Sequence, residues 1–249
     1  MRTSGITSTT PEEISQNAAV VFKNLKYVYT KVEVEEDSDA PEGALKVVAD
    51  GTKEDEKTIQ LKKLKNHGVS FIGLAEGYDT PNVGDYVIGA WDDSEENVLC
   101  ATSGGTKAKI VSEFLDIDVD GAYVKVSGFK VKTGEQASIE ANMLNQSVES
   151  LKRAIVGKEV EDGLIKGFTQ IETKPLLELS DYLTNIGYVY RKSNGKMVII
   201  IMENVICSSG FETENKNKDA AVTPITFECT ADFKSGKYDT LPVYIFYED

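Results

Sequence analysis

A two-residue alternation between apolar and polar side chains constrains the fold of this chain more than any other feature. Residues 137–144, ASIEANML, place an apolar residue at every second position, and residues 225–232, ITFECTAD, do the same. Residues 241–247, LPVYIFY, put apolar side chains at every second position from Leu241. Successive side chains of a β-strand point to opposite faces, so this period predicts strands with one buried and one solvated face.

Residues 116–127, DIDVDGAYVKVS, look like the start of a calcium-binding loop, because three aspartates alternate before a glycine. Position 12 of such a loop must be a bidentate glutamate, and here it is Ser127. The flanking segments are rich in β-branched and aromatic residues, and Asp120-Gly121 between them is typical of a two-residue hairpin turn. The sequence therefore predicts a β-hairpin and no calcium site.

Two helices are predicted among the strands. Thr10, Pro11 and Glu13 form a capping box, which predicts a short helix that begins near Pro11. Residues 146–157, QSVESLKRAIVG, have apolar residues at spacings of three and four before a terminating glycine, which predicts one central helix. Asn194-Gly195 predicts a further hairpin. The whole pattern is that of a mainly β protein, an antiparallel β-sandwich or barrel that carries a helix.

The segment from Lys31 to Asn97 has a weaker pattern. Its two acidic stretches, at 33–42 and 92–96, are predicted to be solvated loops. Residues 53–68 fit either a short helix or an irregular strand. Three short strands are predicted between Gly and Pro residues, at 44–49, 70–74 and 86–91.

The charge and the length of the apolar runs exclude several classes of protein. The 249 residues carry a formal net charge of −14, which argues against a protein that grips nucleic acid by its phosphates. The longest apolar run, at 197–201, is far shorter than the roughly 20 residues of a membrane-spanning helix. The first 13 residues lack the apolar core of an export signal, so we expect synthesis in the cytosol and no membrane partner.

No motif indicates catalysis or a metal site. His67 is the only histidine, and it lies in a polar stretch without a G-x-S-x-G motif elsewhere in the chain. Residues 103–107, SGGTK, lack the Walker spacing of a phosphate-binding loop. The three cysteines have no C-x-x-C spacing and are predicted to be small buried hydrophobes: Cys100, Cys207 and Cys229. We expect no enzyme, no cofactor and no metal.

Three features follow one another between residues 98 and 155: the turn ATSGG before a strand, the hairpin DIDVDG, and the alternating strand that runs into SVESLKRAI. The segments PEEISQNAAVVFKNL, TFECTAD and LPVYIFY precede and follow them. In this order the segments resemble those of the major tail tube proteins of long-tailed (siphovirus-type) phages of Gram-positive bacteria. The resemblance covers most of the chain outside residues 31–97.

The resemblance implies a virion structural protein. Such a protein is an antiparallel β-sandwich that polymerises as stacked, hexameric rings into the phage tail tube, the conduit for genome ejection. Its partners would be other copies of itself and further tail proteins, namely the tape measure, terminator and distal tail proteins. DNA would pass through without specific binding, since a negative wall repels phosphates. The protein would be made in the cytoplasm of the bacterial host and would reside in the virion tail.

The resemblance also implies a division of the chain. Residues 1–30 would form an N-terminal arm, a short helix and the first strand. Residues 31–97 exceed the family's usual connection and would form an acidic insertion, on the outer surface or as an enlarged sheet. Residues 98–249 would complete the tail-tube core, continuous with residues 18–30.

Two sets of residues are expected to matter for a tube. Acids expected to face the channel are Glu135, Glu140 and Asp118; that they are merely solvated is the open alternative. Residues expected in self-assembly are those of the N-terminal capping box and of the predicted hairpin turn: Thr10, Pro11, Glu13, Asp120 and Gly121.

Two other functions stay open. The inner tube of a contractile tail or tailocin belongs to the same mechanical class. A monomeric adhesion or carbohydrate-binding β-sandwich belongs to a different class and would need an exposed aromatic platform, for which Trp91 and the tyrosines near it are the candidates.

Overall fold

The chain forms two compact units in the computed structural model. Unit 1 comprises residues 1–23 and 98–249, and unit 2 comprises residues 24–97. The described residues are 15, 19–35, 38–52, 57–118, 120, 124–125, 127–144, 147–160, 163–213, 221–232, 236 and 238–248. The helix predicted near Pro11 lies outside them.

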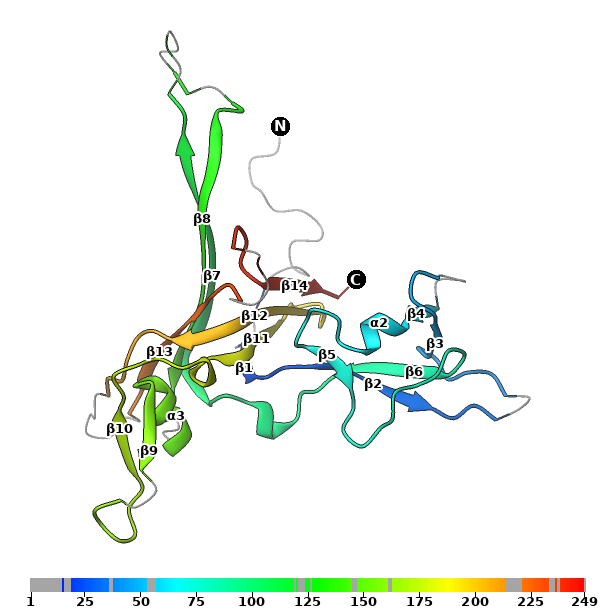
Figure 1. Ribbon diagram of the computed structural model, residues 1–249, viewed down its shortest axis with the longest axis horizontal. Helices are drawn as coiled ribbons and strands as arrows, with labels where there is room; N and C mark the ends of the chain where they lie inside the picture. The colour runs from blue at the N-terminus through cyan, green and yellow to red at the C-terminus, as the bar shows by residue number, and fades with distance from the viewer. Residues whose placement is uncertain are drawn as a thin grey trace. The chain divides into compact units, whose positions relative to one another are not determined.

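Unit 1 is built on a seven-stranded sheet of order β1-β11-β12-β13-β8-β7, with β14 paired to β12 outside this path (Figure 1). Every pair in it is antiparallel. Its strands are β1 (Val20–Lys23), β7 (Thr102–Asp116), β8 (Lys130–Met143), β11 (Leu183–Arg191), β12 (Met197–Cys207), β13 (Thr223–Cys229) and β14 (Val243–Tyr247). A separate antiparallel pair joins β9 (Gly157–Val160) to β10 (Gln170–Thr173). The prediction of a mainly β protein with antiparallel sheets is confirmed.

Two of the three alternating segments bury the face that their pattern predicts, whereas in β14 that face is exposed at Ile245 (61%) and Tyr247 (52%). In β8, Ala137 and Ile139 are buried in the core of unit 1, whereas Glu140 on the other face is half-exposed. In β13, Ile225 and Phe227 enter the same core. Each such strand therefore contributes one apolar face to the core and leaves its other face to solvent.

The predicted central helix is α3 (Val148–Ala154), and its N-terminus is closed by a capping box between Ser147 and Ser150. Its C-terminus differs from the prediction, because the residue in the left-handed region is Val156 (φ 48°) rather than the glycine that follows. Gly157 has another role. A Cβ there would lie 2.8 Å from the carbonyl oxygen of Glu172, so only glycine permits the close pairing of β9 with β10.

Unit 2 has a five-stranded sheet of its own, of order β4-β3-β6-β2-β5. The elements are β2 (Tyr27–Val32), β3 (Leu45–Val48), β4 (Thr58–Gln60), α2 (Leu61–Leu64), β5 (Ile72–Leu74), β6 (Tyr86–Trp91) and the 3-10 helix η1 (Glu95–Asn97). The three predicted strands are confirmed, and the undecided stretch 53–68 contains both a strand and a helical turn. The pairs β2–β5 and β3–β4 are parallel, so this sheet is mixed rather than purely antiparallel.

The boundary between the units falls earlier than expected. The strand-like run that begins at Ala18 is divided into β1 in unit 1 and β2 in unit 2. Asn24 lies between them with φ 52°, a conformation that asparagine tolerates better than most residues. The run therefore contributes one strand to each of the two sheets, and unit 2 begins at Asn24.

Candidate assembly surface

The β7–β8 hairpin continues past the sheet that anchors it. β13 pairs with β8 only between Ser138 and Met143, and β7 is the edge strand of the sheet. Further out, β7 is the only strand that pairs with β8 in the described part of the chain. This outer part, residues 110–117 and 129–137, is called the ribbon below, and it projects from unit 1 (Figure 1). A two-stranded ribbon is marginally stable alone in water, and its outer backbone groups can pair with another chain.

One face of the ribbon is apolar and exposed. Leu115 pairs with Val131 across the ladder, and one step further out the N–H of Ile117 donates to the carbonyl of Phe129 at 2.8 Å. These four side chains are between 43% and 59% exposed. Opposed residues and residues two apart share a face, so the four form one continuous patch, called the apolar stripe below.

The other face of the ribbon carries charged side chains and one exposed aromatic ring, that of Phe114, which is 55% exposed and lies beneath the ammonium of Lys130. Asp116 forms an ion pair with Lys125, and Lys132 lies 3.0 Å from Glu135. The hydrogen bond from Lys125 lowers the pKa of Asp116 and raises that of the lysine. Asp116 and Lys132 therefore have partners within the chain, and exposed apolar side chains lie on both faces of the ribbon.

The register of the β7–β8 ladder differs from the one that the predicted turn would give. A two-residue turn at Asp120-Gly121 would pair Asp116 with Lys125 in the ladder, but the backbone register pairs Asp116 with Lys130. The antiparallel pairing of β7 with β8 is confirmed, and its register does not continue into a two-residue turn at Asp120-Gly121, of which Gly121 lies outside the described residues. The register is fixed where β8 packs on the core, and that packing outweighs the preference of one dipeptide.

The acids predicted to line a channel lie on different surfaces. Glu140 is on the exposed face of β8, 3.3 Å from Lys107. Glu135 is on the opposite face, where it accepts a hydrogen bond from the N–H of Leu241 at 3.0 Å. That bond, and then Lys132, lowers the pKa of Glu135. The two glutamates therefore cannot share one face of the sheet, while their exposure to a channel stays a prediction.

The remaining predicted site residues are only partly described. Asp118 and Asp120 are exposed in the connection between β7 and β8. The others lie outside the described residues: Thr10, Pro11, Glu13 and Gly121. Sequence reasoning missed the apolar stripe, although the run IVSEFLDI contained its signal, since apolar residues there occupy both faces of one strand.

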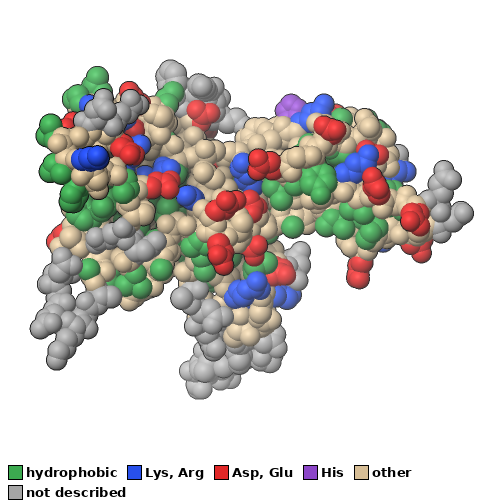
Figure 2. All heavy atoms as spheres, turned by 90° about the horizontal axis from the view of Figure 1, so that it is seen from below, with side chains coloured by type: hydrophobic (Ala, Val, Ile, Leu, Met, Phe, Trp, Pro, Cys, Tyr) green, Lys and Arg blue, Asp and Glu red, His purple; other side chains and the backbone are tan. Residues whose placement is uncertain are grey.

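A second exposed apolar surface lies around β9 and β10, at the end of unit 1 opposite the ribbon (Figure 1). Six large apolar side chains in it are 60–89% exposed: Leu164, Ile165, Phe168, Leu176, Leu177 and Leu179. Figure 2, which looks from below, shows hydrophobic side chains gathered at this end. Contiguous apolar surface of this kind is uncommon on a protein that works alone.

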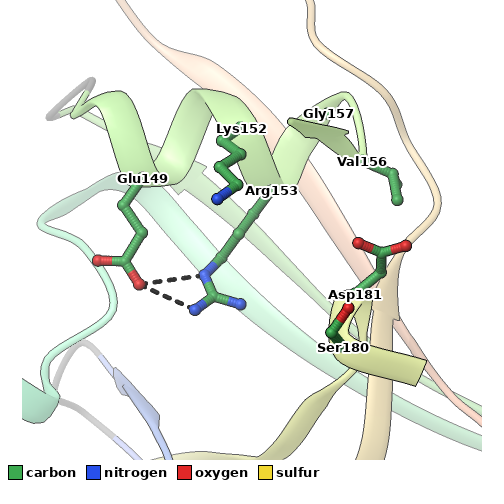
Figure 3. Close-up of a pocket in the computed structure, with 7 residues that line it drawn as sticks. All are labelled: Glu149, Lys152, Arg153, Val156, Gly157, Ser180 and Asp181. Atoms are coloured by element: carbon green, nitrogen blue, oxygen red, sulfur yellow. Dashed lines mark hydrogen bonds and ion pairs between the residues drawn. The ribbon is translucent and has the colours of Figure 1, made fainter. Parts of the chain in front are cut away.

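A cleft of about 310 Å³ lies between α3 and the 3-10 helix η2 (Leu179–Asp181). Figure 3 shows Lys152 and Arg153 on one side of it and Asp181 on the other. Arg153 is engaged by Glu149 at 2.8 Å, and Asp181 by a lysine at 2.5 Å. Burial opposes ionisation of Asp181, but the hydrogen bonds from Lys174 and from the backbone of Glu178 outweigh it and, together with the charges of Lys174 and Lys152, lower its pKa.

The cysteines and the aromatic residues serve the two cores. All three cysteines are buried and free, as predicted, and burial raises the pKa of Cys100 to about 11. In unit 2, Trp91 packs edge-on against Tyr27 with ring centres 5.0 Å apart and stacks on Phe71. Trp91 is thus half-buried among aromatic neighbours, which does not favour an exposed platform for a carbohydrate.

In the parts of the chain that the structure describes, no group of three His, Cys, Asp or Glu side chains could hold a metal ion. Within those parts no helix is long and apolar enough to cross a bilayer. Comparison with known protein families found no match, and no curated protein proved similar.

Proposed function

We propose that this protein is a structural subunit of a phage tail tube, in which copies close into rings and the rings stack into a hollow conduit for DNA. The observation that carries the proposal is the ribbon, which has open strand edges and an apolar stripe that the described part of its own chain leaves uncovered. The order of sequence segments that resembles tail tube proteins supports the same function.

The physics of the ribbon favours completion by sister copies. The unpaired backbone N–H and C=O groups of an open strand edge can pair with a further strand. Natural proteins that leave such edges uncovered use them for assembly. A contact between two different surfaces relates each copy to the next by a fixed rotation. The copies close into a ring if repeated rotation brings the last copy back to the first, and otherwise they continue as an open polymer. A tube needs both outcomes, one around the ring and one along its axis.

The charge of the chain is compatible with a conduit. A wall that carries part of a net charge of −14 repels phosphates, so DNA can slide through without being held. Glu140 and Asp118 are exposed and remain candidates for the bore. Glu135 is the weaker candidate, because its carboxylate is engaged by Leu241 and Lys132.

Negative-stain electron microscopy of the concentrated protein tests the proposal. We expect rings or tubes with a central hole from the wild type. The double variant Leu115→Glu, Val131→Glu should form neither, because it places charges in the apolar stripe. Val83→Glu is the matched control, since it alters a side chain in unit 2 that is 58% exposed, and it should assemble like the wild type. A wild-type protein that stays monomeric at every concentration would contradict the proposal.

A further inference from the structure

We propose that the connection between β9 and β10 inserts into the surface of a neutral lipid bilayer. This connection, residues 163–169, is called the apolar tip below, and it projects from unit 1 (Figure 1). Its three large apolar side chains, those of Leu164, Ile165 and Phe168, are 89%, 63% and 75% exposed. The inference goes beyond the proposed function and does not depend on it.

The apolar tip is held in one shape by hydrogen bonds of its own. The side-chain Oε1 of Gln170 accepts the N–H of Leu164 at 2.9 Å. The N–H of Phe168 donates to the carbonyl of Ile165 at 3.2 Å, across a turn in which Gly167 has φ 88°. A loop that is already ordered loses less conformational freedom on binding, so the three apolar side chains are presented ready for a contact.

These hydrogen bonds favour lipid as the partner. Hydrocarbon offers no group that can pair with a backbone N–H, so a segment that enters it must satisfy its polar groups internally. The N–H groups of Leu164 and Phe168 are satisfied in this way. A protein partner imposes no such requirement, because it can supply hydrogen bonds across the interface.

Two clefts of unit 1 could receive a side chain from a second copy, and neither matches an apolar tip. The cleft beside α3 has Val156 as its one large apolar lining residue. The cleft over β7, β8 and β13 is lined mainly by glycine and polar residues, with Ile225 as its one large aliphatic side chain. A bilayer needs no matching pocket, because its hydrocarbon chains rearrange around the side chains that enter.

The charges around the apolar tip determine which lipid surface it fits. Lys166 is the only charged residue within it, and a lysine can extend its ammonium to the headgroups while its stem stays among apolar groups. Glu161 and Asp162 precede the tip in the sequence, and the chain carries a net charge of −14. These charges repel an anionic surface. The surface is therefore one of zwitterionic phospholipid.

Membrane contact of this kind needs no spanning segment. A spanning helix requires about 20 apolar residues, and the lack of such a run led to the sequence-based expectation of no membrane partner. A tip that enters only the interface requires a few exposed apolar side chains. The run Leu164-Ile165 was too short to indicate this from the sequence.

Flotation with vesicles tests the inference. The full-length protein is mixed with phosphatidylcholine vesicles and centrifuged through a density gradient, in which bound protein rises with the vesicles. We expect the wild type to float and the double variant Leu164→Asp, Phe168→Asp to float at least about tenfold less, because it places charges in hydrocarbon. The control Tyr78→Asp, Val83→Asp alters two exposed apolar side chains of unit 2 and should float like the wild type. Circular dichroism melts establish that each variant is folded.

A tryptophan in the apolar tip measures insertion directly. The wild type has one tryptophan, Trp91, which is half-buried in unit 2 and supplies the background signal. With phosphatidylcholine vesicles, the emission of Phe168→Trp should move to shorter wavelength, and lipids brominated in their acyl chains should quench it. Val83→Trp is the matched control and should show neither change.

Lipid composition tests the neutral surface. Replacing part of the phosphatidylcholine by phosphatidylglycerol at low ionic strength should reduce flotation severalfold, and added salt should restore it. Stronger flotation with the anionic lipid would overturn the assignment to a neutral surface.

Three results would overturn the inference as a whole. They are a wild type that does not float, a tip variant that floats as well as the wild type, and a Phe168→Trp emission that vesicles leave unchanged. If the tip variant loses self-association while the wild type never floats, the apolar tip is a protein contact instead. Tubes without flotation leave the proposed function standing, and flotation without tubes leaves this inference standing.

Discussion

Unit 2 and unit 1 treat their apolar residues differently. Unit 2 wraps its five-stranded sheet around a small core that includes Val47 and Val87, and its exposed large apolar side chains among the described residues are Tyr78 and Val83. Unit 1 has the larger core and still exposes two extended apolar surfaces, the apolar stripe and the region of β9 and β10. The difference indicates that the described part of unit 1, more than that of unit 2, has surfaces suited to burial by another molecule.

The connection between the units leaves the sheet of unit 1 uninterrupted. The chain leaves unit 1 after Lys23 and returns at Val98, and Phe22 and Val98 form a β-bridge. The N–H of Leu99 donates to the carbonyl of Val21 at 2.8 Å. Unit 2 therefore occupies the position of a loop between neighbouring points of one sheet, a position in which insertions are tolerated.

The largest expected effect comes from the core of unit 1. Phe227 is 2% exposed, and Phe227→Ala should lower the free energy of unfolding of unit 1 by about 3–5 kcal/mol. Hydrogen exchange measured by mass spectrometry should accelerate in β8, β12 and β13 and stay unchanged in residues 24–97. Phe129→Ala makes the same chemical change on the ribbon and should cost far less, because Phe129 is 43% exposed. Equal acceleration in both units would break the comparison.

A smaller effect is expected from a substitution in unit 2, which should destabilise unit 2 and leave unit 1 unchanged. A Cβ on Gly89 would lie 2.5 Å from the ring of Tyr27, which Trp91 holds in place. Gly89→Ala should therefore destabilise unit 2 by about 1–3 kcal/mol and leave exchange in unit 1 unchanged. Gly73→Ala is the control, since nothing lies within 4 Å of its Cβ and its φ is not positive. If both variants unfolded at the same denaturant concentration, the packing of Tyr27 over Gly89 would be refuted.

The smallest effect concerns Glu135, near the point where the ribbon leaves the sheet. Its pKa is lowered by the N–H of Leu241 and by Lys132, so the charged form stabilises the fold. This contribution is complete above the ordinary glutamate pKa of about 4.3 and is lost as the pH falls through the lowered value of the folded state. Glu135→Gln should cost about 1 kcal/mol at pH 7 and less at pH 3, as measured by urea unfolding. A loss of equal size at both pH values would show that the charge contributes nothing.

Several elements could be predicted from the sequence because their signals are local. The alternation in 137–144 and 225–232 gave the strands and their buried faces, and the spacing in 146–157 gave α3. The hairpin at Asn194-Gly195 also formed, with Gly195 in the left-handed region at φ 83°. In each case the residues that carry the signal are neighbours in sequence and in the element.

The candidate site could be predicted only in part. The Asp-Gly signal and its strand-like flanks placed β7 and β8 in one hairpin, but the end of the ladder at Asp116 and Lys130 depends on how the inner part of β8 packs on the core. The cleft joins α3 to η2, which follows β10 along the chain, and no local pattern relates them. Unit 2 has its own sheet because β2 pairs with β5 and β6 rather than continuing β1, and the sequence shows one uninterrupted strand-like run there.

By itself, the sequence determined that this protein is mainly β, which face of its alternating strands is buried, and that its net charge is negative, since these properties depend on side-chain order and composition. Only the tertiary structure decided which strands share a sheet, how far the ribbon extends beyond its neighbours, and that two exposed apolar surfaces lie at opposite ends of unit 1. The physical reason is that pairing register and exposure depend on contacts between residues far apart in the chain, whose energies outweigh local preferences.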